Sequence, residues 1–173
     1  MRHMEQNFAE PTLRVLSIVP GTSVDGPGLR TSIYFAGCAH KCEGCHNPQS
    51  WDFAGGKKMT VSEIVRIVEE NGFNVTFSGG DPLYQIPALT KLAGELKLRG
   101  YDIWCYTGFQ FEQLREDSSM AELLPMLDVI VDGPFVLQQR DLTLLFRGSA
   151  NQRIIEVGET LRCGVISLWQ EEF

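Results

Sequence analysis

The chain has 173 residues, a formal net charge of −7 at pH 7 and a hydrophobic fraction of 43%. This length and composition indicate one globular domain over residues 1–173 and exclude disordered and fibrous proteins. An acidic chain without a run of lysine or arginine is not expected to bind nucleic acid, and no apolar run reaches the about 20 residues that cross a membrane. Five cysteines, three of them clustered, predict reduced thiols in a cytoplasmic protein rather than disulfides.

The first half of the chain alternates strand-like and helical segments. We expect a first or edge strand at 13–19, a strand at 31–36 and a short buried strand at 74–77. A helix is predicted to begin after Thr60, which opens a capping-box pattern, and to end at Gly72.

The second half continues this alternation. The expected elements are a helix at 86–99, a strand at 101–106, helical pieces at 111–116 and 121–124, a strand at 127–131, a helical turn at 135–139 and strand-like runs at 142–146 and 154–157. Strands that alternate with helices indicate βαβ units and a mostly parallel sheet. A complete eight-stranded barrel takes about 200 residues or more, so the predicted fold is α/β, a partial, open β/α barrel. Residues 1–8 are expected to be disordered or cloning-derived, and the packing of residues 158–173 is not predicted.

Five of the strand-like runs end in short polar loops that contain glycine. In parallel α/β sheets such loops lie side by side at the carboxyl edge, where ligands bind. Glycine permits backbone shapes and close approaches that other residues do not. We therefore expect the five loops to surround one site; they lie at 36–38, 78–81, 107–108, 132–133 and 147–149.

The first of these loops begins a cluster of three cysteines, Cys38, Cys42 and Cys45, at the spacing C-x3-C-x2-C. A [4Fe–4S] cluster normally takes four thiolates, so three would leave one iron open to a small molecule. Structural zinc also takes four ligands, and His40 or His46 lies close enough in sequence to supply the fourth. The residues alone favour an iron–sulfur cluster and leave zinc as the alternative. His40 itself is expected to be a solvated loop residue.

The cysteine spacing is the signature of the radical S-adenosylmethionine (SAM) enzymes. Together with the preceding Asp-Gly-Pro-Gly-Leu-Arg at 25–30 and the following residues 46–52, it resembles the glycyl-radical-enzyme activases. Stretches at 78–83, 106–108, 131–133 and 147–152 are similar to the activases of anaerobic (class III) ribonucleotide reductase. The resemblance runs over about residues 14–155. It implies an open barrel of the radical SAM type, a [4Fe–4S] cluster held by the three cysteines, and SAM bound at the open iron.

The resemblance also implies that SAM is bound from the strand ends. The matching residues are Gly44, His46, Ser78, Gly79, Gly80, Asp81, Thr107, Asp132, Arg147 and Asn151. The carboxylate of Asp81 can pair with the SAM ammonium group, and it can also cap a helix that begins at Pro82. Arg147 and Asn151 can hold the SAM carboxylate or ribose, or shape the interface with a partner. No catalytic side chain is expected beyond the cluster and SAM.

The implied activity is that of a radical SAM oxidoreductase. It would cleave SAM reductively and abstract a hydrogen from a glycine of anaerobic ribonucleotide reductase, with the electron supplied by a reducing protein such as flavodoxin or ferredoxin. Two alternatives within catalysis are an activase of the pyruvate formate-lyase type and a small-molecule radical SAM enzyme. A non-catalytic metal-binding or electron-transfer module is a third, but it would leave the other four strand-end loops unexplained.

Overall fold

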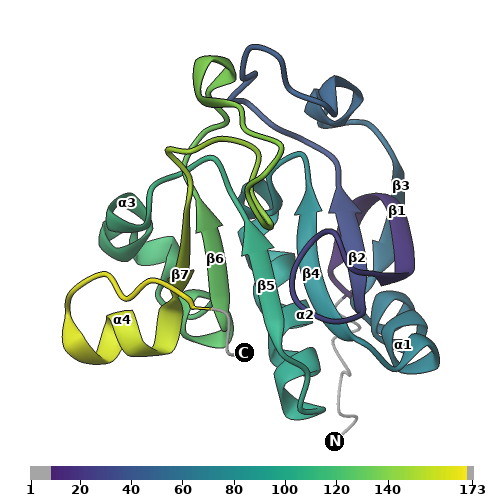
Figure 1. The fold of residues 1–173 in the computed structure, drawn as a ribbon. Coiled ribbons are helices and arrows are strands. Elements are labelled where there is room, and N and C mark those ends of the chain that lie inside the picture. Colours follow the sequence, from purple (N-terminus) through teal and green to yellow (C-terminus); the bar gives the residue numbers. More distant parts are fainter. Residues whose placement is uncertain (1–8, 171–173) are drawn as a thin grey trace, which may run out of the picture.

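The strands of the computed structural model, which describes residues 9–170, form one open sheet in the order β3-β1-β2-β4-β5-β6-β7 (Figure 1). The strands are β1 Thr12–Thr22, β2 Arg30–Phe35, β3 Lys57–Thr60, β4 Asn74–Gly79, β5 Ile103–Tyr106, β6 Val129–Asp132 and β7 Arg153–Glu156. The expectation for residues 1–8 lies outside the described residues. The described helices are not long and apolar enough to cross a membrane.

The centre of the sheet is parallel and its two edges are antiparallel. Strands β2, β4, β5 and β6 run parallel, whereas β1 pairs antiparallel with β2 and β3, and β7 pairs antiparallel with β6. The prediction of an α/β fold with a parallel centre to the sheet is therefore confirmed, whereas the partial barrel of the radical SAM type stays a prediction. The edge strand β3 was not predicted, because it has four residues and only Met59 among them is buried.

Within residues 9–170, four α-helices connect or follow the strands: α1 Val61–Asn71, α2 Ile86–Leu98, α3 Phe111–Glu116 and α4 Val157–Cys163. The predicted capping box opens α1, since Thr60 Oγ1 accepts from the Glu63 amide at 3.1 Å and Glu63 Oε2 accepts from the Thr60 amide at 2.7 Å. Gly72 ends the same helix with a left-handed φ of 70°. Both ends of α1 are thus confirmed.

Alternate side chains of each central strand point to opposite faces of the sheet. On one face, which we call the helix face, Ile33, Phe77 and Cys105 join the main core with residues of α1 and α2 such as Ile64 and Leu92. On the other, which we call the open face, Trp104 and Val131 form a smaller cluster with Phe146 and Trp169. Loops rather than helices cross the open face, as Figure 1 shows for the segments before β2 and after β6.

Two predictions for the second half are corrected and a third is confirmed in part. Residues 142–146 are not a strand but a series of turns, because Asp141 Oδ1 accepts from both the amide and the hydroxyl of Thr143, and Phe146 has a left-handed φ of 55°. The helical piece at 121–124 is replaced by two short 3₁₀ turns, Ser118–Met120 and Leu124–Met126. The turn at 135–139 is confirmed in shortened form as Leu137–Gln139.

The C-terminal segment packs on the sheet as far as it is described. Ile155 bridges Leu168, the Trp169 amide donates to Ile154 O at 2.8 Å, and the Trp169 ring lies 5.2 Å from Trp104. This segment therefore closes part of the open face.

Candidate functional site

The cysteine loop and the loop after β4 are joined backbone to backbone at the carboxyl edge of the sheet. The Gly80 amide donates to Phe35 O at 2.8 Å and the Asp81 amide to Gly37 O at 2.9 Å. A Cβ on Gly80 would lie 2.5 Å from Gly37 O, and Gly79 has a φ of 105°. Neither position accepts a side chain without displacing backbone. The glycine pair thus has a packing function of its own.

The three clustered cysteines lie on one turn of loop above this contact. Cys38 is 8% exposed, Cys42 and Cys45 are half-buried, and the Cys45 amide donates to Cys42 O at 3.1 Å. Burial raises the pKa of the Cys38 thiol and the nearby Asp81 charge adds to this, whereas backbone N–H groups of His40 and Lys41 lower it. Among the described residues, no three His, Cys, Asp or Glu side chains are placed close enough together to hold a metal ion.

The other two cysteines lie away from this loop. Cys105 is fully buried in the helix-face core, and burial raises its pKa well above the usual thiol value. Cys163 is exposed on α4. The cysteines therefore separate into one loop set and two single thiols in different surroundings.

Asp81 is confirmed as a cap and also makes contacts that the sequence did not reveal. Its Oδ1 accepts from the Leu83 amide at 3.0 Å, at the start of the 3₁₀ turn Pro82–Gln85. Its Oδ2 accepts from Thr107 Oγ1 and the Gly108 amide, each at 2.9 Å, and lies 2.8 Å from His40 Nε2. The expectation that His40 is a solvated loop residue is wrong, because its side chain is 18% exposed and bound to Asp81.

Asp132, at the end of β6, is also buried, and its carboxylate is hydrogen-bonded within the protein. It accepts from the Phe111 amide at 2.8 Å, at the start of α3, and from Arg153 Nε at 3.1 Å. Arg153 also forms two bonds to Glu112, at 3.0 and 2.7 Å, and lowers the pKa of Glu112 to about 2. The network ties β6, β7 and α3 together beside the site.

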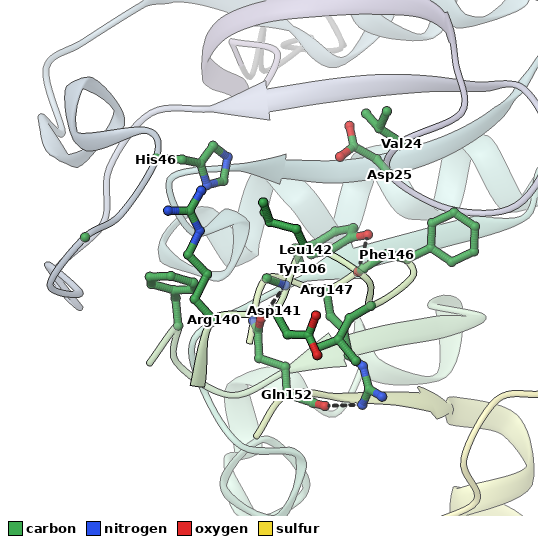
Figure 2. Close-up of a pocket in the computed structure, with 14 residues that line it drawn as sticks. Val24, Asp25, His46, Tyr106, Arg140, Asp141, Leu142, Phe146, Arg147 and Gln152 are labelled. Carbon is green, nitrogen blue, oxygen red and sulfur yellow. Dashed lines mark hydrogen bonds between the residues drawn. The ribbon is translucent and has the colours of Figure 1, made fainter. Parts of the chain in front are cut away.

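A cavity of about 630 Å³ opens on the open face below the cysteine loop (Figure 2). Of the predicted residues, Gly44, His46 and Arg147 line it, together with Asp25, Tyr106, Arg140 and Gln152. The other predicted binding residues do not line it: Ser78, Gly79, Gly80, Asp81, Thr107, Asp132 and Asn151. In Figure 2, Arg140 reaches toward His46 from the opposite wall.

The cluster at 147–152 mainly braces its own loop. Arg147 donates to Gln152 O at 2.7 Å, and Gln152 Oε1 accepts from the Gly148 amide at 3.0 Å. Asn151 donates to Pro134 O at 2.8 Å, and its buried Oδ1 has no hydrogen-bond partner among the described residues. Because residues 142–146 are turns, this loop is not a strand end, yet Arg147 still reaches the cavity.

Comparisons with known proteins show the family to which this chain belongs. The family described as a 4Fe-4S single cluster domain matches residues 24–155. An anaerobic ribonucleoside-triphosphate reductase-activating protein of Haemophilus influenzae is 33% identical over 152 residues, which cover 82% of this chain and 97% of the relative. Those of Escherichia coli K12 and Enterobacteria phage T4 are 32% and 35% identical, over 77% and 79% of this chain and 92% and 90% of their own lengths. This chain belongs to that family of activating proteins. The crystal structure of QueE from Escherichia coli aligns with a TM-score of 0.48 and 16% identity, over 56% of this chain and 52% of QueE.

Membership in the 4Fe-4S family indicates a [4Fe–4S] cluster rather than zinc, and the matched residues 24–155 include the cysteine loop. The donor set fits that group, since three soft thiols share one loop. The Asn47 amide donates to Cys45 Sγ at 3.4 Å, and backbone N–H groups also face Cys38. Hydrogen bonds of this kind stabilise negative charge on cluster sulfur.

The sequence analysis assigned no site role to four residues that the activating protein places in or beside the cavity: Asp25, Tyr34, Tyr106 and Arg140. The Tyr34 hydroxyl donates to Asp25, and burial and that carboxylate raise the pKa of Tyr34 to about 12. Tyr106 donates to Phe146 O at 2.7 Å. The alternation of side chains along a strand could have found the two tyrosines. Each follows a residue of the helix-face core, so its own side chain must point to the opposite face.

Proposed function

We propose that this chain activates an anaerobic (class III) ribonucleotide reductase by producing a glycyl radical on it, with SAM as the co-substrate. The observation that carries the proposal is the position of the three-cysteine loop directly above a cavity of about 630 Å³, in a chain that belongs to the reductase-activating family. A three-thiolate cluster keeps one iron free, and the cavity offers room beside it.

Each residue of the site has a separate part in this proposal. Cys38, Cys42 and Cys45 hold the [4Fe–4S] cluster, which when bound supplies the electron and the open iron for SAM cleavage. Gly44 and His46 form the wall of the cavity next to the third cysteine, so they face SAM. The loops before β2 and after β6 form the other walls of this space.

The strand-end residues act in two ways. Arg147, which lines the cavity, offers a guanidinium to the SAM carboxylate. Ser78, Gly79 and Gly80 bring backbone groups to the carboxyl edge, while Asp81, Thr107, Asp132 and Asn151 use their side chains to hold neighbouring loops. We therefore assign direct SAM contacts to the cavity residues and backbone, and support to the four side chains.

The partners follow from the same proposal. The substrate is a backbone glycine of the reductase, which must reach the open face. The electron comes from a small reducing protein such as flavodoxin or ferredoxin, in the cytoplasm.

The proposal is tested by anaerobic reconstitution with iron and sulfide, reduction in the presence of SAM, and assay for 5′-deoxyadenosine. A parallel sample contains the reductase and is followed by electron paramagnetic resonance. We expect 5′-deoxyadenosine and a glycyl radical that depends on the reductase. Product without that radical would contradict the reductase as substrate. Neither product from protein with a full cluster, or stoichiometric zinc without iron, would contradict SAM chemistry altogether.

A further inference from the structure

The carboxylate of Asp81 is used entirely inside the protein. The side chain is fully buried and its two oxygens receive four donors: the Leu83 and Gly108 amides, the Thr107 hydroxyl and the His40 ring nitrogen. A carboxylate oxygen only accepts, so His40 Nε2 carries the hydrogen of that bond. A carboxylate with four protein donors has little capacity left for a ligand ammonium group.

His40 is held as firmly as Asp81. It lies between Cys38 and Cys42, and its ring packs edge-on against Phe109 with centroids 4.6 Å apart and against Tyr84 at 5.8 Å. Tyr84 in turn packs on Phe53 at 5.3 Å. The ring thus joins the cysteine loop to the segments that follow β4 and β5.

Gly108 leaves the space that the His40 ring fills. A Cβ at Gly108 would lie 2.6 to 2.8 Å from three atoms of that ring, closer than side chains approach in folded proteins. The backbone of Gly108 is not left-handed, so the ring is the reason that a side chain is not accepted there. The His40 position is therefore fixed by a hydrogen bond, aromatic contacts and steric fit together.

We propose that His40 and Asp81 form a clasp that fixes the cysteine loop on the loops after β4 and β5, and that Asp81 influences SAM through this clasp rather than by contact. His40 and Asp81 are then positioning residues, and the SAM ammonium group is held by backbone at the carboxyl edge. The part that concerns SAM rests on the proposed function, whereas the clasp itself does not.

The clasp is tested first in the protein without cluster or SAM, by amide hydrogen exchange over residues 38–47. We expect His40→Ala to speed exchange there by about tenfold, because it removes one hydrogen bond to a charged group. Gly108→Ala should do the same by pushing the ring away, and the double variant should exchange no faster than either single variant. His40→Gln, whose amide nitrogen lies as many bonds from the backbone, should restore slow exchange. Gly158→Ala is the matched control, since a Cβ there meets nothing within 4 Å.

Additive effects of His40→Ala and Gly108→Ala, or wild-type exchange in either, would overturn the clasp. The second arm measures SAM binding by equilibrium dialysis with reconstituted protein. The clasp predicts that His40→Ala and Asp81→Asn weaken SAM binding by similar factors and that the double variant is no worse, with His40→Gln close to wild type. Loss of binding in Asp81→Asn alone would instead make its carboxylate the ammonium ligand. Wild-type protein that binds no SAM would contradict the proposed function, while the exchange experiment would still decide the clasp.

Discussion

The two faces of the sheet are built from the same strands but carry different parts of the protein. Ile33 and Phe77 are fully buried in the core under α1 and α2, whereas their neighbours Tyr34 on β2 and Ser78 on β4 are only partly buried. Tyr106, next to the buried Cys105 on β5, lines the cavity. Alternate residues of each strand therefore contribute to stability on the helix face and to the site on the open face. Substitutions on the helix face should reduce stability, and substitutions on the open face should reduce function.

The largest expected effect is the loss of activity without loss of stability when a cysteine of the loop is replaced. Cys42→Ala should abolish SAM cleavage, because two remaining thiolates cannot hold the cluster. Its side chain is only half-buried, so the free energy of unfolding of the cluster-free protein should change by less than about 1 kcal/mol. Anaerobic turnover and urea unfolding measure the two. Cleavage retained in this variant would contradict the ligand assignment.

On the helix face we expect the opposite, a large loss of stability. Leu92→Ala removes a fully buried side chain of α2 and should lower the free energy of unfolding by about 2–5 kcal/mol. Leu98→Ala, at the exposed end of the same helix, is the control and should change it by less than about 0.5 kcal/mol. Urea unfolding measures both. Equal effects at the two leucines would show that the helix face is not the main source of stability.

A smaller effect is expected where the open face holds its covering loop. Tyr106→Phe removes the hydrogen bond to Phe146 O and should lower stability by about 1 kcal/mol. The residue that loses its partner has a left-handed backbone, which the bond helps to maintain. We expect faster trypsin cleavage after Arg140 and Arg147, followed by mass spectrometry. An unchanged cleavage rate would mean that aromatic packing alone holds the loop.

The smallest expected effect comes from the ion pair that joins β7 to α3. Arg153 depresses the pKa of Glu112 from 4.5 to about 2, so the pair contributes stability that is present above pH 4.5 and lost as the pH falls to about 2. Glu112→Gln should flatten the pH dependence of stability in that window. The Glu112 side chain is 46% exposed, so salt should shrink the difference. Urea unfolding at several pH values checks it, and identical pH profiles would contradict the pairing.

The sequence was most informative where the signal is local. The capping box of α1 and four of the five glycine loops, which follow strands β2, β4, β5 and β6, depend on neighbouring residues, and the structure has them as predicted. The partner of His40 lies 41 residues away, and Arg153 lies 21 residues from Asp132. Such pairings depend on how strands are ordered, which no spacing reveals. The false strand at 142–146 has the opposite cause, since its apolar residues suit a strand but the turn at Asp141 prevents one.

Because the cysteines lie in different surroundings, their alkylation rates should report two separate events, the binding of the cluster and the unfolding of the domain. The thiolate is the nucleophile that reacts with alkylating reagents. Cys163 is exposed but its hydrogen bond to Glu159 raises its pKa, so it should be modified slowly, at a rate that does not depend on the cluster. Loading the cluster should remove the loop thiols from this series and leave Cys163 unaffected. Cys105 is fully buried and should be modified only when the core opens. One time course of alkylation would then report how much protein carries its cluster and how often the domain unfolds.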